Sequence, residues 1–369
     1  MTERYVIVTL NDDTNYGNRL QNYALTRLLG EYGEVTTAYC AALRKMPAWL
    51  AGPFHRTVKM VKLCAQGIKN RDLRLRVKRY KKFRKFDTKM TPTCVGVDIF
   101  KGVYPKRYLG STFVFGSDQI WNYVNAHLDE SLRLFSLYLG SFLPDDVHRV
   151  SYAASFGTSV MPPDDVRQAF RVYLPKFEAL SVREFAGCKI IRDTTGLDAK
   201  VVLDPTLMLT ANEWLSITEH FVPENEKYVL TYFLGKPTEE QQSCIDAYAR
   251  EHGCVVRNML DINDRHTYLA APQDFVELFA KASYVFTDSY HACCFSILFH
   301  KQFSVYSRVG MEGKSSMNSR METLFEHFDL DSVMLESDLA PTIDYERVDA
   351  LLAELRSVSA SWLKAALRK

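Results

Sequence analysis

The chain has 369 residues, of which 47% are hydrophobic and 24% charged, a composition typical of a globular protein and long enough for two domains. Its net charge of +2 favours no class of partner, and no apolar run approaches the roughly 20 residues that span a bilayer. The eight cysteines form no CxxC pair, which excludes a zinc-ligand spacing and a disulfide framework. We therefore expect reduced thiols, no metal site and a cytoplasmic protein.

The N-terminal segment predicts a βαβ unit. Arg4–Leu10 reads as a buried parallel strand, because its apolar run is short and flanked by charge, unlike a signal peptide. A loop rich in turn formers follows, and then helical spacing of apolar residues over residues 18–33. A second strand is expected over residues 34–40. This order predicts a parallel sheet.

Residues 55–89 are strongly basic. Between Arg56 and Lys89 there are 14 Lys or Arg residues against two aspartates, and the remainder of the chain has a net charge of −10. Apolar side chains recur at about every third position, which predicts an amphipathic helix or helical pair: Val77, Tyr80, Phe83 and Phe86. The segment is either a solvated helical face or a docking surface for anionic lipid or a lipid-pyrophosphate-linked sugar. The acidic body and the absence of a recognition motif argue against nucleic acid.

The rest of the chain continues as alternating strands and helices. Further strands are predicted over residues 111–116, 149–155, 179–184 and 200–205, and a second βα series over 227–307. Its helices are expected at 239–252, at 273–282 and from residue 289, and a long helix at 344–367. Two α/β halves therefore meet near residues 205–227.

Polar loops follow several of the predicted strands. In open parallel sheets, ligands bind beyond the carboxyl ends of the strands. Three ionisable side chains stand at such ends: Asp118 in "GSDQ", Arg183 in "SVRE" and His291 in "TDSYH". His291 also begins a run that is otherwise apolar, where Thr287, Asp288 or Ser289 can cap a helix whose N–H groups favour anions.

Each of these three residues has a structural alternative. His291 can donate to a phosphate or pass a proton, or it can be a hydrogen-bonded core histidine. Arg183 can grip a carboxylate or phosphate, or it can pair with Glu184. Asp118 can act as a base toward a hydroxyl, or it can cap a helix. The turn around Gly17 is not GxGxxG, so a dinucleotide fingerprint is absent.

Seven sequence blocks, in order, resemble the polysaccharide pyruvyl transferase family. They are "NYGNRLQNYAL", "GSDQIWN", "SYAASFG", "SVRE", "VLDPTLML", "TDSYHACCFSILFHKQF" and "NSRMETLF", and they span residues 15–325. The resemblance implies an α/β fold of the GT-B type, with two Rossmann-like domains that face a cleft. We expect an N-terminal acceptor domain at 1–208 with the basic helical insert at 55–89. A C-terminal donor domain follows at 209–345, and a helix at 346–369 packs back on the N-terminal domain.

The same resemblance implies transfer of the enolpyruvyl unit of phosphoenolpyruvate to a sugar as a pyruvate ketal, without a cofactor. It places Arg183 and His291 at the donor and Asp118 at the reacting centre. Some family members carry Arg-Leu-His where this chain has Ser289-Tyr290-His291, so one donor-binding cation is missing there. Lys314 or Arg320 is expected to replace it. The predicted acceptor-binding residues are Asn15, Asn18, Gln21, Gln119 and Trp121.

Within this reading, His291 is the acid or phosphate partner and Asp118 the base. The acceptor is expected to be a polysaccharide precursor of capsule or exopolysaccharide type, and the protein cytoplasmic or peripheral on the inner membrane face. Two alternatives stay open at this point. One is a nucleotide-sugar-dependent glycosyltransferase on the same fold, and the other a non-catalytic glycan-binding member of the family.

Overall fold

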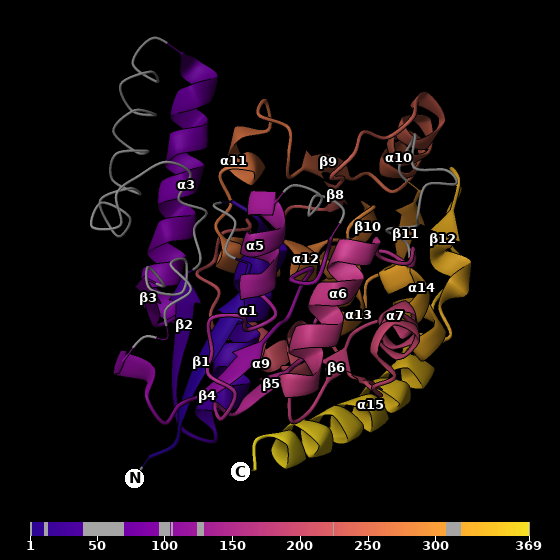
Figure 1. Cartoon of the computed structure of the whole chain (residues 1–369). Coiled ribbons are helices and arrows are strands. Elements are labelled where there is room, and N and C mark those ends of the chain that lie inside the picture. The colour runs from indigo at the N-terminus through magenta and orange to yellow at the C-terminus, as the bar shows by residue number, and fades with distance from the viewer. Residues whose placement is uncertain are drawn as a thin grey trace.

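The computed structural model describes residues 2–10, 14–39, 70–95, 104, 106–123, 129–223, 225–307 and 319–368, and these form two α/β halves (Figure 1). The first half contains a five-stranded parallel sheet in the order β3-β2-β1-β4-β5. Its strands are β1 (Arg4–Thr9), β2 (Glu34–Tyr39), β3 (Thr93–Val95), β4 (Thr112–Phe115) and β5 (Arg149–Ser151). This is the Rossmann strand order, in which β2 and β3 are added on one side of β1, and β4 and β5 on its other side.

The second half repeats the principle with a different strand order, β12-β11-β10-β8-β9, again all parallel. The strands are β8 (Tyr228–Tyr232), β9 (Val255–Asn258), β10 (Tyr284–Thr287), β11 (Phe303–Tyr306) and β12 (Met334–Leu335). Here the order reverses between β8 and β10. In the first half, β6 (Ser181–Val182) and β7 (Lys200–Val201) form a short parallel pair, and isolated bridges connect the segment around β6 to that around β5.

Helices cover both sheets. Those before β8 are α1 (Tyr16–Gly30), α3 (Arg71–Met90), α5 (Asp129–Leu137), α6 (Asp164–Tyr173), α7 (Phe185–Thr195), α8 (Pro205–Met208) and α9 (Ala211–Leu215). Those after β8 are α10 (Glu239–Glu251), α11 (Arg265–Tyr268), α12 (Pro272–Lys281), α13 (Tyr290–Leu298), α14 (Ser319–Phe328) and α15 (Tyr345–Ala366). None of the described helices combines the length and hydropathy of a membrane span.

The predicted βα series is confirmed for the elements named from the sequence. The strand predicted at Arg4–Leu10 is β1, and the amphipathic helix predicted from Val77, Tyr80, Phe83 and Phe86 is α3, with these four residues buried. The strands predicted over residues 149–155, 179–184 and 200–205 are shorter than expected, since β5 ends at Ser151 and β6 and β7 have two residues each. Helices α5, α6, α7 and α14 were not predicted.

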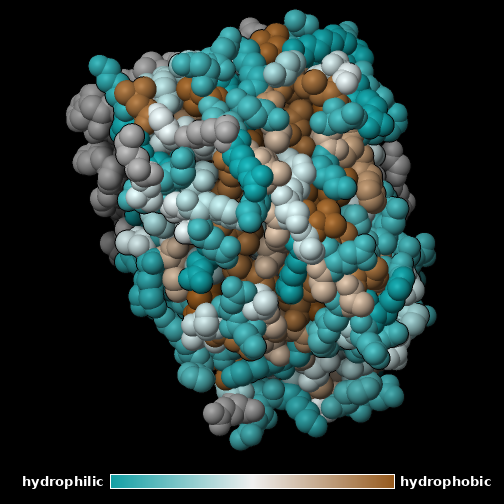
Figure 2. Space-filling view, turned by 90° about the horizontal axis from the view of Figure 1, so that it is seen from below, coloured by the Kyte–Doolittle hydropathy of each residue, from teal (hydrophilic) through white to brown (hydrophobic). Residues whose placement is uncertain are grey.

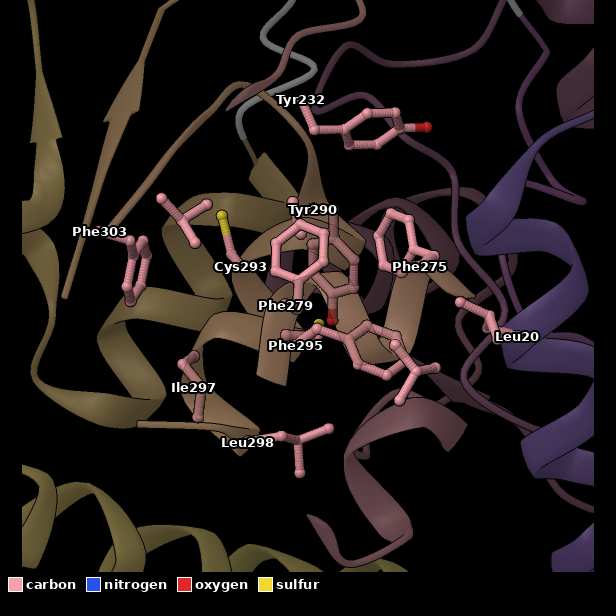
Figure 3. Packing of buried hydrophobic residues seen from close by; sticks show 14 of the residues in the cluster. Leu20, Tyr232, Phe275, Phe279, Tyr290, Cys293, Phe295, Ile297, Leu298 and Phe303 are labelled. Atoms are coloured by element: carbon pink, nitrogen blue, oxygen red, sulfur yellow. The ribbon is translucent and has the colours of Figure 1, made fainter. Parts of the chain in front are cut away.

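The hydrophobic core of the second half is built around α13. All nine residues of this helix are buried, which is why its sequence is apolar on every side. Figure 3 shows Cys293, Phe295 and Ile297 of α13 among the buried residues, with Phe275 and Phe279 of α12 close to Phe295. Burial of one such aromatic side chain stabilises the fold by about 2–3 kcal/mol. The helix is therefore a fixed support for whatever its first turn carries.

The basic helix α3 also belongs to this core. Phe83 packs on Tyr16 of α1 with ring centroids 4.8 Å apart, and Phe83 and Phe86 share a cluster with residues of α12 and α13. The Arg79 guanidinium donates from Nη1 to the carbonyl oxygens of Met259 and Tyr268, at 3.1 and 3.2 Å. A helix that precedes β4 in sequence is thus bound to the second half.

The last helix, α15, contacts both halves. It runs along the lower side of the molecule in Figure 1, toward the N-terminus. Val348 and Leu352, near its start, belong to the core of the second half, whereas Leu363 and Ala366 pack in a cluster with Ile7 of β1. The face seen from below carries hydrophilic residues at its border and hydrophobic residues toward the middle (Figure 2). The domain boundaries at residues 208 and 345 stay predictions.

Candidate functional site

A pocket of about 250 Å³ lies where the two sheets present the carboxyl ends of their strands. Its lining comes from the segments after β1, β4, β8 and β10 and from α14: Leu10, Asn15, Gly17, Asn18, Asp118, Gln119, Tyr232, Leu234, Ser289, Tyr290, His291 and Arg320. The points at which the strand order reverses, between β1 and β4 and between β8 and β10, therefore open on one cavity. Open α/β sheets bind ligands at such points. We call this cavity the His291 pocket.

His291 stands in the first turn of α13 at the wall of this pocket. Its ring lies directly against Gly17 of α1, because a Cβ added at Gly17 would stand 2.1 Å from Nδ1 of His291. On the other side, Nε2 lies 3.8 Å from Oδ2 of Asp204 and has no hydrogen-bond partner among the described residues. The ring is thus held between the backbone of Gly17 and the carboxylate of Asp204.

The N-terminus of α13 is open toward the same cavity. Ser289 is the N-cap residue, but its side chain makes no capping hydrogen bond. Asp288 instead accepts the N–H groups of Leu234 and Gly235 at 2.7 and 2.8 Å, and Thr287 accepts the N–H of Ser289 at 3.0 Å. The prediction that one of these three side chains caps the helix is therefore wrong. An uncapped N-terminus leaves free N–H groups and partial positive charge for an anion.

Arg183 lies behind the pocket and does not line it. Its side chain is fully buried, with Nη2 3.0 Å from Oδ1 of Asp118 and Nη1 2.8 Å from Oδ2 of Asp204. The third carboxylate, that of Glu184, is 3.9 Å from Nε, so the Arg183–Glu184 pair considered from sequence is the weakest of the three contacts. The guanidinium stacks on Tyr290 at 4.4 Å from the ring centroid. Its contacts fix Asp118 and Asp204, and direct contact with a donor stays a prediction.

Asp118 reaches the pocket from the turn after β4. Its backbone has a φ of 63°, a left-handed conformation that aspartate tolerates better than most residues. The carboxylate accepts a hydrogen bond from Nδ2 of Asn18. Burial acts to raise the pKa of Asp118, but Arg183, His291 and Arg320 outweigh it and lower that pKa below its ordinary value. Asp118 is therefore ionised at neutral pH and only weakly basic.

Arg320, on α14, provides a cation that faces the pocket. Burial, with Arg183 acting in the same direction, lowers its pKa to about 10, so it stays protonated at neutral pH. With the Gln119 carboxamide oxygen turned toward it, that oxygen accepts from Nη1 and Nη2 at 2.6 and 3.0 Å. The Arg320 guanidinium also lies over the Tyr290 ring, 5.8 Å from its centroid. Nε of Arg320 is buried and has no partner among the described residues.

Comparison with family models assigns the chain to a family. The family model of polysaccharide pyruvyl transferases matches residues 15–308. The chain belongs to the polysaccharide pyruvyl transferase family. No curated protein matches it in sequence.

Among solved structures, the fold is similar to that of a Listeria monocytogenes protein named as a UDP-N-acetylglucosamine 2-epimerase. The TM-score is 0.53 at 10% identity, covering 100% of this chain and 92% of that one. Other matches are the S. aureus MnaA–UDP co-structure, at TM-score 0.48, 10% identity and coverages of 98% and 91%, and UDP-GlcNAc 2-epimerase from Neisseria meningitidis bound to UDP-GlcNAc, at 0.43, 13%, 100% and 95%. The predicted GT-B-like fold of two Rossmann-like domains is confirmed by the first of these likenesses.

The residues expected to bind the acceptor in this pyruvyl transferase family member separate into two groups. Asn15, Asn18 and Gln119 line the His291 pocket. Trp121 is fully buried, donates from Nε1 to the carbonyl of Tyr138 at 3.0 Å, and packs in the first core. It does not line the His291 pocket, and its contact with an acceptor stays a prediction.

Gln21 is also internal. Its carboxamide donates to Oγ1 of Thr9 at 3.0 Å and accepts the N–H of Ser117 at 3.1 Å, so it holds the ends of β1 and β4 together. It supports the pocket without lining it. Lys314, the other predicted donor cation, lies outside the described residues. Ser289 and Arg320 both line the pocket, as the donor assignment requires, although their contact with a donor stays a prediction.

Asp204 and Gly17 are central residues to which sequence analysis gave no role. Asp204 caps α8 through the N–H of Thr206 at 3.0 Å and also accepts from Ser117 and Arg183. Burial acts to raise its pKa, but His291 and Arg183 hold the pKa of Asp204 well below its ordinary value. The block "VLDPTLML" contained this aspartate, and a helix N-cap was the signal that could be read there. Its contact with His291 depends on the tertiary structure.

Proposed function

We propose that this protein transfers the enolpyruvyl unit of phosphoenolpyruvate to two hydroxyls of a sugar and forms a pyruvate ketal on a polysaccharide precursor. The single observation that carries the proposal is the His291 pocket. It combines an uncapped helix N-terminus, a histidine that lines the cavity and a buried arginine in a volume of about 250 Å³. Family membership supports the same reaction class.

The two anionic groups of phosphoenolpyruvate match the two cationic ends of the pocket. Helix N-termini bind phosphate through free N–H groups, so we assign the phosphate to the first turn of α13 beside His291. The carboxylate is assigned to Arg320, because this guanidinium lines the pocket whereas Arg183 is occupied by Asp118 and Asp204. Arg320 thereby takes the place of the cation that is missing at Ser289.

The chemistry then needs one proton donor and a stabilised cationic centre. His291 donates a proton to the methylene carbon of phosphoenolpyruvate, and the double bond becomes an oxocarbenium-like centre at the adjacent carbon. A sugar hydroxyl adds to that centre and its proton passes to His291, which is thereby reprotonated. The second hydroxyl then attacks the same carbon, the carbon–oxygen bond to phosphate breaks, and inorganic phosphate leaves with the electron pair and the proton of the second hydroxyl.

Asp118 is given a different role from the one expected from sequence. Because its pKa is lowered, it is a weak base for a hydroxyl proton. An ionised carboxylate at this place instead stabilises the positive charge that develops in the transition state. Independence from a metal or cofactor stays part of the proposal.

The experiment is a comparison of ligand binding and turnover in matched histidine variants. Phosphoenolpyruvate should raise the melting temperature of the wild type, because a ligand that binds the folded state stabilises it. His291→Asn should lose phosphate release in the presence of an acceptor by about 100-fold or more, while its unfolding stays cooperative. His300→Asn is the control, since His300 is half-exposed and pairs with Asp349 at 2.9 Å, away from the pocket.

The same experiment separates the alternatives. A nucleotide-sugar panel that raises the melting temperature and releases nucleotide, with no response to phosphoenolpyruvate, would favour a glycosyltransferase and overturn the proposal. A response to phosphoenolpyruvate without phosphate release from any acceptor would favour the non-catalytic member. Full activity of His291→Asn would refute the assignment of the proton donor.

Association with an anionic membrane through residues 55–89 stays a prediction, as do the lipid-pyrophosphate-linked acceptor and the peripheral location. Residues 55–69 lie outside the described residues. In α3 the apolar positions Val77, Phe83 and Phe86 are consumed by the protein core, so this helix has no apolar face left to insert into lipid. Any contribution of α3 to such binding must come from its exposed charges.

A further inference from the structure

A second, larger pocket adjoins the His291 pocket. It has a volume of about 620 Å³ and is lined by Thr14, Asn15, Arg76, Arg79, Tyr232, Leu234, Leu260 and Tyr268. Asn15, Tyr232 and Leu234 line both cavities, so a ligand in one reaches the other without crossing the core. We call it the Arg79 pocket. One wall is the basic helix α3, and the opposite wall comes from the second half of the molecule.

Arg79 is a buried cation without a carboxylate partner among the described residues. It is 5% exposed, and the contacts of its guanidinium are the carbonyls of Met259 and Tyr268 and the rings of Tyr16, Phe83 and Tyr268 at 4.8–5.6 Å. Carbonyls and aromatic faces orient a guanidinium but leave its full charge uncompensated. A buried guanidinium of this kind is stabilised when an anion binds next to it. Here an anion can reach Arg79 through the pocket.

The other residues that line the Arg79 pocket provide charged, apolar and aromatic surface suited to a sugar. Arg76 lies one turn before Arg79 on α3, is exposed, and forms no ion pair with the described residues. Leu234 and Leu260 are 49% and 38% exposed although they are large and apolar, and Tyr268 is half-buried. Apolar and aromatic surface packs against the C–H face of a pyranose, while a pair of guanidinium groups binds phosphate or carboxylate.

We propose that the Arg79 pocket binds the acceptor, and that the acceptor is a sugar carrying an anionic group, either a phosphate or a carboxylate, held by Arg76 and Arg79. The word acceptor rests on the proposed function. The binding of an anionic sugar in the Arg79 pocket does not depend on it. It assigns the basic helix α3 a role in selecting the acceptor. The sugar hydroxyls would extend past Asn15 toward His291.

The test uses three probes and a pair of variants with opposite expectations. Glucose 1-phosphate, glucuronate and glucose are titrated in thermal-shift and calorimetric measurements, alongside phosphoenolpyruvate. Arg76→Gln should weaken binding of at least one of the two anionic probes about tenfold, the loss of one charge-assisted contact, and leave phosphoenolpyruvate binding unchanged. Arg320→Gln, or His291→Asn if the former fails to fold, should show the reverse. Lys78→Gln is the control on α3, because Lys78 is exposed and does not line the pocket.

Each outcome decides the inference. Response to glucose 1-phosphate alone identifies phosphate as the anionic group, and response to glucuronate alone identifies a uronic acid. Equal binding of glucose and the anionic probes, no binding of any probe at millimolar concentration, or an Arg76→Gln variant that behaves like the wild type would each overturn it. If phosphoenolpyruvate fails to bind while the Arg76-dependent response persists, the proposed function fails and the anionic-sugar site remains.

Discussion

At the scale of single residues, the buried ionic network decides what each charged group can do. Arg183 pairs with Asp118 and Asp204 while its side chain is fully buried, so its charge is neutralised inside the fold. Removing one partner of such a network leaves an uncompensated buried charge, which costs about 3–5 kcal/mol. Arg320 hydrogen-bonds to the neutral Gln119 carboxamide and interacts with Asp118 and Glu184 only at longer range, so its guanidinium can still pair with a ligand. The same residue type therefore has a positioning role at one site and a binding role at the other.

Gly17 is the residue on which the placement of His291 depends. Gly17→Ala would put a methyl group 2.1 Å from Nδ1 of His291, so the ring must leave its present position, where its other side faces Asp204. A shift of about 1 Å at a reacting group typically costs about 100-fold in rate. We expect kcat/KM to fall by that order, measured by phosphate release. Gly30→Ala in the same helix meets no atom within 4 Å and should change neither activity nor stability appreciably. Equal behaviour of the two variants would show that the contact is unimportant.

At the scale of elements, α3 shows how one amphipathic helix serves two purposes. Its apolar face completes the core between the halves, and Arg76 and Arg79 face a pocket. Insertion into a membrane and packing in the core would require the same apolar residues of α3, and in this structure these residues are buried. Helix α3 is therefore a structural part of the molecule.

A substitution at Phe83 tests whether α3 is an integral part of the core. The side chain is fully buried against Tyr16, so Phe83→Ala leaves a cavity and should lower the free energy of unfolding by about 3–5 kcal/mol. Lys85→Ala, at an exposed position of the same helix, should stay within about 0.5 kcal/mol of the wild type. Chemical denaturation of both variants measures the difference. A small effect of Phe83→Ala would mean that α3 is a separable appendage.

At the scale of the whole molecule, the two halves meet at the points where their strand orders reverse, and the carboxylate of Asp204 connects them. Asp204 accepts from Arg183, which follows β6, and faces His291 of α13 in the second half. Helix α15 adds a second link, because Ser359 accepts the N–H of Leu203 at 3.0 Å and Arg356 donates to the carbonyls of Leu207 and Leu209. These contacts hold the two halves in an arrangement in which the His291 pocket and the Arg79 pocket adjoin.

The pH dependence of stability should report the Asp204 network. Because the pKa of Asp204 in the folded state lies below its ordinary value of 3.8, its contribution is present above that pH and is lost as the pH falls below it. Asp204→Asn should therefore be less stable than the wild type near neutrality, by about 3–5 kcal/mol, and its melting temperature should fall less steeply below about pH 4. Asp118→Asn should change the slope in the same direction, since the pKa of Asp118 is also lowered. Parallel melting curves of variant and wild type across this range would contradict the assignment.

The sequence predicted the fold where a local pattern carried the information. Periodicity identified β1, α3, α10 and α12, and polar residues after strands identified Asp118 and His291 as site candidates. Their placement in one pocket was implied by the family resemblance, because they follow strands of two different sheets. It could not distinguish a loop aromatic that lines a site from one that seals the core, and Trp121 belongs to the core. Local pattern also left helices such as α6 and α14 unassigned.

The sequence by itself determined the fold class, the family and the presence of a histidine at the start of a buried helix, because each depends on the order and spacing of residues. Tertiary structure alone decided which arginine is free. Arg183 and Arg320 are indistinguishable as isolated side chains, and only folding brings Asp118 and Asp204 to the first and a neutral carboxamide to the second. The reason is that charge compensation acts over a few ångströms in space, at sequence separations that no local pattern records.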